Sequence, residues 1–123
     1  MNKPLAFGAL SYAAVGVAGL VAPERIPALF GGTAATPASR TEIRAVYGGF
    51  PLAAALTTVL TPARVGLPFG LMTAGMAAGR VAGAALEGEV DGTTKFFVAL
   101  ETAMAAAFLV GGITANRPVR TTA

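Results

Sequence analysis

VGLPFGLMTAGMAAGRVAGAAL, residues 65–86, is an apolar run with a single charge, Arg80, inside it. A helix needs about 20 predominantly apolar residues to cross the roughly 30 Å hydrocarbon core of a bilayer, and this run is long enough. A spanning segment must also satisfy its backbone polar groups internally, and the run lacks the alternation typical of a barrel strand. The segment is therefore predicted to be a transmembrane helix.

Three further apolar runs, residues 5–22, 42–60 and 95–114, accompany it and leave no room for a soluble domain. Only 12% of the residues are charged, whereas a soluble domain carries about 25%. The fold class is therefore predicted to be all-α: a four-transmembrane-helix antiparallel bundle that forms one integral membrane domain over residues 1–123. The expected location is the plasma (inner) membrane, with multiple passes.

The connections between the runs differ in length. The long connection between the first two is expected to hold a short interfacial helix, begun by Pro23 and stopped by Gly31 and Gly32. Leu29 and Phe30 would anchor this helix in the headgroup layer. The other two connections are short, which makes successive helices antiparallel neighbours.

The distribution of charge predicts the orientation of the bundle. The side that carries the termini holds basic residues without any acid: Lys3, Arg64, Arg117 and Arg120. The opposite side mixes acids with bases: Glu24, Glu87, Glu89 and Asp91 with Arg25, Arg40 and Lys95. Both termini are therefore expected in the cytoplasm. The net charge of +3 is a topology signal under this interpretation, and no nucleic-acid partner is expected.

The residue inventory argues against enzymatic chemistry. The chain has no His and no Cys, which removes the commonest metal ligand, the usual proton shuttle and any thiolate. No nucleophile stands beside a base in the sequence. We expect no catalytic residue, no metal site and no cofactor.

Ionisable residues inside the apolar runs are the candidates for a specific site, because a charge in hydrocarbon is costly and usually functional. In an antiparallel bundle Arg80 and Glu101 lie at matching depth, roughly 9 Å below the membrane surface opposite the termini. An Arg and a carboxylate can pair through two hydrogen bonds. The predicted buried ionic cluster, structural or ligand-binding, comprises Glu42, Arg44, Tyr47, Arg80 and Glu101.

Each member of the cluster has a simpler alternative. Glu42 is expected to point towards Arg80, or else to form a capping box with Ser39. Arg44 is expected at the interhelical boundary or at lipid phosphate. Tyr47 is either an interfacial aromatic residue or a hydroxyl that closes the network. The pair of Arg80 with Glu101 is either a structural clamp or a ligand or transport site.

Small residues at four-residue spacing mark faces where helices in lipid approach closely. Gly75, Gly79 and Gly83 form such a ridge on the third run, and Gly49 lies between Ala45 and Ala53 on the second. These ridges are interpreted either as internal seams of the bundle or, for the third run, as the interface for a helix of another protein.

The run Glu42-Ile-Arg-Ala-Val-Tyr-Gly-Gly49, followed by Gly79-Arg80 and by Glu101, resembles an uncharacterised bacterial family of small four-helix integral membrane proteins with an E-I-R-A-x-Y-G-G motif. The resemblance spans nearly the whole chain. It implies the four-span fold and places the motif with the Gly-Arg and Glu positions, but it implies no activity. A looser similarity to DoxX-like proteins concerns architecture only. Residue usage resembles that of a high-GC actinobacterium.

These observations favour a non-enzymatic accessory subunit that packs against other integral membrane subunits and lipid, in a larger membrane or lipid-transport complex. The alternative is a small-molecule or proton-coupled transporter or channel that uses the buried Glu/Arg site. Four helices would have to form a homo-oligomer to enclose such a pathway, and no internal repeat is evident. A membrane enzyme is the least favoured class.

Overall fold

The computed structural model describes residues 1–116, which form helices and no strand. The elements in chain order are α1 (Lys3–Val21), α2 (Arg25–Ala28), α3 (Pro37–Ile43), the π-helical η1 (Arg44–Gly49), α4 (Phe50–Leu60), α5 (Pro62–Glu87) and α6 (Gly92–Ala115). Because α3, η1 and α4 are continuous, four helices are long and apolar enough to cross a membrane. The predicted all-α fold with four such helices is confirmed.

The second spanning helix begins earlier than the sequence suggested. The Thr36 side chain accepts a hydrogen bond from the Ser39 amide, and the Ser39 hydroxyl accepts one from the Thr36 amide. Pro37 takes the first helical position, where a missing N–H costs nothing. The capping box predicted between Ser39 and Glu42 is therefore wrong, because the box lies one turn earlier.

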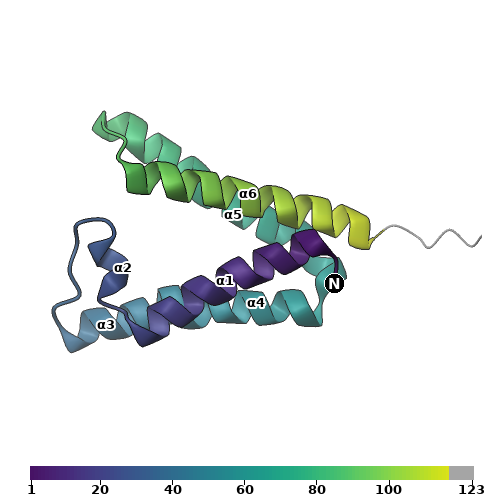
Figure 1. Ribbon diagram of the computed structural model, residues 1–123, viewed down its shortest axis with the longest axis horizontal. Coiled ribbons are helices and arrows are strands. Elements are labelled where there is room, and N and C mark those ends of the chain that lie inside the picture. The colour runs from purple at the N-terminus through teal and green to yellow at the C-terminus, as the bar shows by residue number, and fades with distance from the viewer. Residues whose placement is uncertain (117–123) are drawn as a thin grey trace, which may run out of the picture.

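The four long helices form two hairpins (Figure 1). In one, α1 packs against η1 and α4; in the other, α5 packs against α6. The hairpins meet through α1 and α6 near the chain's N-terminus, and they diverge towards the opposite end, where α2 lies (Figure 1). A short loop joins α5 to α6, whereas the long segment of residues 22–36, which contains α2, joins α1 to α3.

An aromatic cluster, in which Tyr12 and Phe108 are buried and Phe69 is partly buried, joins the hairpins. The rings of Tyr12, Phe69 and Phe108 lie with centroids 5.6–6.4 Å apart, one ring from each of α1, α5 and α6. The Tyr12 hydroxyl lies 2.6 Å from the Thr73 hydroxyl oxygen. Since the Thr73 hydroxyl donates its own hydrogen to the Phe69 carbonyl, Tyr12 is the donor in this contact. A buried polar link therefore accompanies the apolar packing.

Glycines allow the helix backbones to approach closely at two seams. Gly66 of α5 and Gly112 of α6 lie so close that a Cβ on either would overlap the Cα of the other. Gly19 of α1 meets the Tyr47 carbonyl of η1 in the same way. Close backbone approach of this kind is how helices associate in lipid, where no hydrophobic force drives them together.

The small-residue face that was predicted to pack on the second spanning helix is not the face that packs in the structure. Ala45, Gly49 and Ala53 are all exposed, and Gly48 is buried against Leu20 of α1 instead. The π-helical hydrogen bonds of η1 change the number of residues per turn, so faces counted at α-helical spacing drift in this segment. Small size alone therefore does not identify the packed face.

Candidate functional site

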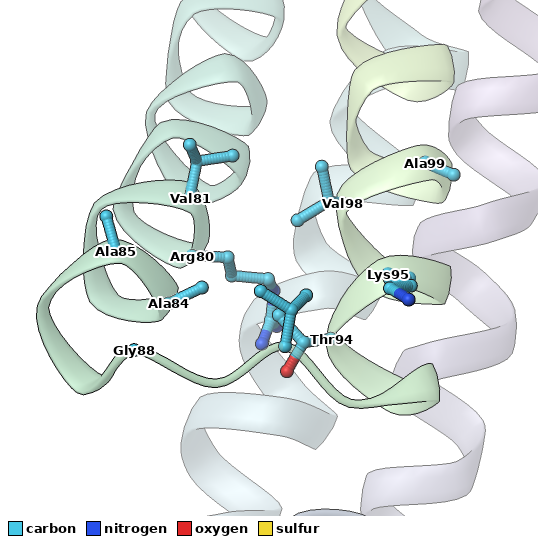
Figure 2. A pocket seen from close by; sticks show the side chains of 10 residues that line it. Arg80, Val81, Ala84, Ala85, Gly88, Thr94, Lys95, Val98 and Ala99 are labelled. Atoms are coloured by element: carbon cyan, nitrogen blue, oxygen red, sulfur yellow. The ribbon is translucent and has the colours of Figure 1, made fainter.

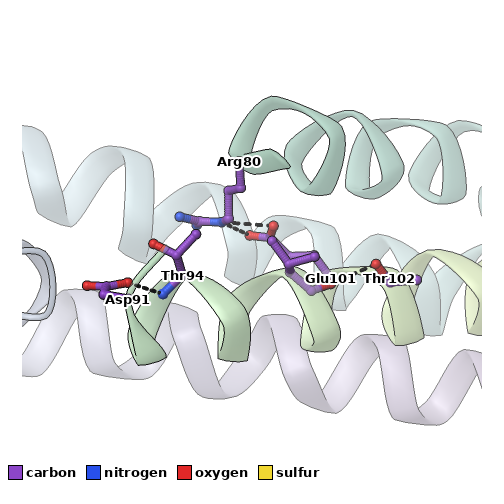
Figure 3. Close-up of polar contacts among 6 residues, drawn as sticks. Arg80, Asp91, Thr94, Glu101 and Thr102 are labelled. Carbon is purple, nitrogen blue, oxygen red and sulfur yellow. Dashed lines mark hydrogen bonds and ion pairs between the residues drawn. The ribbon is translucent and has the colours of Figure 1, made fainter. Parts of the chain in front are cut away.

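Arg80 of α5 and Glu101 of α6 form an ion pair between the two helices (Figure 3). The Arg80 Nε donates to both carboxylate oxygens, each at 2.9 Å. The Glu101 side chain is 5% exposed and the Arg80 side chain is 26% exposed. The carboxylate is thus buried and depends on its partner, whereas the guanidinium reaches the surface. Arg80 and Glu101, which were predicted to pair because they lie at the same depth below the membrane surface, therefore do lie together.

Two aromatic rings flank the guanidinium. Its carbon lies 4.9 Å from the centre of the Phe97 ring and 5.3 Å from that of Phe30. Ring faces attract a cation at these distances. Phe97 precedes Glu101 by four residues on α6, so helical spacing could have placed it at the site. Phe30 follows α2, and no local pattern in the sequence predicted its contact with Arg80. The segment that contains α2 and Phe30 thus packs beside the ion pair.

A groove of about 580 Å³ lies beside the pair, between the adjoining ends of α5 and α6 (Figure 2). Its polar lining comes from Arg80, Thr94 and Lys95. Its apolar walls include Val81, Ala84, Val98 and Ala99. Figure 2 shows Arg80 reaching from α5 towards Thr94 at the start of α6. The ion pair therefore lies at the side of a mainly apolar groove.

Asp91 fixes the end of α6 that borders this groove. Its side chain accepts a hydrogen bond of 2.7 Å from the Thr94 amide and so caps the helix. The hydrogen bonds with Thr94 hold the pKa of the Asp91 carboxyl below its ordinary value, because they favour the charged form. The cap is thus ionised at neutral pH and keeps the first turn of α6 ordered.

The remaining predicted cluster members lie elsewhere. Glu42 is exposed on α3 and forms no ion pair with Arg80, so its expected inward orientation is wrong. The Arg44 Nε donates to the Leu20 carbonyl at 3.1 Å, and this contact satisfies an acceptor left over at the end of α1. Tyr47 is exposed on η1. The five-residue cluster therefore reduces to a pair, with Arg44 and Tyr47 at the boundary between α1 and η1.

The glycine ridge of the third span faces away from the rest of the chain. A Cβ added at Gly75, Gly79 or Gly83 would meet no atom within 4 Å among the described residues. Gly49, also predicted to be at an interface, would meet only the Arg44 carbonyl, at 3.9 Å. The ridge is thus not a seam inside residues 1–116.

Metal binding has no candidate site in the described part of the chain. Its acidic residues form no group of three that could hold a metal ion. That the protein has no catalytic residue, no metal site and no cofactor stays a prediction.

Comparison with known proteins gives a family without an activity. No curated protein matches the chain, and no solved structure matches it. The family model described as "Domain of unknown function (DUF4345)" matches residues 2–111. The bacterial distribution and the motif implied by the earlier resemblance stay predictions. With nearly its whole length matched, this chain, which has four helices long and apolar enough to cross a membrane, belongs to the DUF4345 family.

Proposed function

We propose that the protein is a non-enzymatic membrane subunit that binds a transmembrane helix of another integral membrane protein. The interface is the outward ridge of Gly75, Gly79 and Gly83 on α5. A lipid-transport or envelope complex is the class of assembly that we propose for the partner. The sequence offers neither His nor Cys for chemistry, so the proposed role rests on association.

One observation carries this proposal. At eight other helical glycines an added Cβ would come within 3.0 Å of a neighbouring segment, whereas at Gly75, Gly79 and Gly83 it would meet nothing. Three glycines at four-residue spacing form a flat face to which a second backbone can come close. Glycine also weakens an isolated helix by about 1 kcal/mol relative to Ala. Close packing against a partner helix would offset this loss of helix stability.

The transporter alternative has less support from the geometry. It relied on a buried site of Glu42, Arg80 and Glu101, but Glu42 is exposed and away from the pair. The pair itself is internally neutralised. A homo-oligomer that encloses a pathway would still be detected by the experiment below.

Gly79→Leu should release the partner and leave the isolated protein folded, because the new side chain extends only into the open face. The measurement is affinity purification from membranes in mild detergent with mass spectrometry, combined with thermal melting of the purified chain. We expect at least a tenfold loss of the co-purifying partner and an unchanged melting temperature.

Ala106→Leu is the matched control, since Ala106 is an exposed small residue on α6. It should retain the partner. Retention of the partner by Gly79→Leu would remove the ridge from the interface, and co-purification of further copies of the same chain alone would favour the homo-oligomer.

We also propose that both termini are cytoplasmic. The Asn2 side chain donates to the Gly111 carbonyl and to the Thr114 hydroxyl, both at 2.8 Å, so the N-terminus lies beside the end of α6. The start of α1 and the end of α6 thus share one side of the bundle, and the basic excess in the sequence there favours the cytoplasm.

Reporter fusions test this orientation. A reporter inserted at Gly92, where the loop from α5 meets the start of α6, should give the signal of the external side. A fusion after Ala123 should give the cytoplasmic signal. The reverse pair of signals would invert the proposed orientation.

A further inference from the structure

The geometry points to a phospholipid site in the groove between α5 and α6, with the lipid phosphate on Arg80 and Lys95 and an acyl chain along the apolar walls. This inference is independent of the proposed partner helix, which would lie on a different face of α5. It concerns the leaflet next to the loop that joins α5 and α6.

The guanidinium of Arg80 has one side left for a ligand. Phe30 and Phe97 lie near the planar group, and the Nε is used by Glu101. Among residues 1–116 the terminal nitrogens Nη1 and Nη2 have no hydrogen-bond acceptor. Figure 3 shows Thr94 on the side of the guanidinium opposite to Glu101. Two parallel N–H donors of this kind match a phosphate in a bidentate arrangement.

The charge of the groove lining favours an anion. Arg80 and Lys95 both line it, and no acidic residue does. Glu87 at the end of α5 and Glu89 and Asp91 of the adjoining loop do not line the groove. A phosphate would thus meet two cations, of which only Arg80 already has a carboxylate partner in the described structure. A lipid ammonium group at the rim of the groove would be attracted to the acidic residues of the loop.

The walls fit a hydrocarbon chain. Val81 of α5 and Val98 of α6 face each other on the side of the Arg80 side chain away from the loop, whereas Ala84 and Gly88 line the groove on the loop side (Figure 2). In a bilayer, a lipid acyl chain is the available cover for the apolar side chains of Val81 and Val98. The combination of a bidentate donor and an apolar channel selects an amphiphile over a free anion.

Native mass spectrometry of the purified full chain in detergent tests the site. The probes are phosphatidylglycerol, phosphatidylethanolamine, diacylglycerol with the same acyl chains, and inorganic phosphate. We expect both phospholipids to bind and neither diacylglycerol nor inorganic phosphate to do so. Equal binding of diacylglycerol would reduce the groove to an apolar surface, and binding of inorganic phosphate alone would overturn the lipid assignment.

Two variants with matched controls locate the bound lipid without disturbing the ion pair. Lys95→Gln should weaken phospholipid binding about tenfold, as expected for the loss of a charged hydrogen bond, while Lys3→Gln at the far end of the molecule should not. Ala99→Leu should block the channel, while Ala103→Leu, one turn further along α6, should not. Unchanged binding in both Lys95→Gln and Ala99→Leu would place the lipid elsewhere.

Discussion

Arg80→Ala lowers the free energy of unfolding by about 3 kcal/mol, the largest loss we expect from a single side chain, because it leaves a buried carboxylate without its partner. Glu101→Ala should cost less, since the guanidinium is 26% exposed and keeps its contacts with Phe30 and Phe97. The double variant should lose less than the sum of the two single losses. Denaturant titration in detergent micelles measures all three variants.

A second cycle supplies the control. Glu42 is exposed and forms no ion pair with Arg80, so Glu42→Ala and Arg80→Ala should have additive effects. If Arg80 and Glu101 also proved additive, the ion pair would contribute nothing to stability.

Gly66→Ala should cost about 2–3 kcal/mol of stability, as overpacking typically does when the obstructing atoms cannot move aside. A Cβ at this position would overlap the backbone of Gly112, so α5 and α6 would have to separate. Thermal melting of the purified chain should report the loss, and the aromatic cluster next to this seam should loosen with it.

Gly75→Ala is the matched control on the same helix. Its Cβ meets nothing within 4 Å, and alanine favours a helix by up to about 1 kcal/mol over glycine. The variant should be as stable as the original chain or slightly more so. Equal losses in the two variants would mean that the contact between α5 and α6 at Gly66 does not govern the response.

The number and course of the helices followed from the sequence because a bilayer imposes a strong constraint. Lipid offers no hydrogen bonds, so every apolar run of sufficient length must become a helix. The pairing of Arg80 with Glu101 followed as well, since the fixed rise per residue sets the depth of each side chain in an antiparallel hairpin. These inferences need only length, polarity and chain order.

The packed faces could not be predicted in this way. Small residues are so common here that ridges occur on exposed and buried faces alike, as Gly48 and Gly49 illustrate. The buried faces are those that hold the large side chains of Tyr12, Phe69 and Phe108, whose packing depends on three helices at once. A pattern within one helix does not contain that information.

Contacts between residues far apart in the chain could not be predicted from the sequence either. Phe30 was expected at the headgroups, yet it lies against Arg80, from which it is far removed along the chain. Glu42 was expected beside Arg80, yet the hairpins diverge at that end and leave it exposed (Figure 1). Helix length and depth are local properties of a chain in a membrane, whereas the side chain that reaches a buried charge depends on how separate helices pack together.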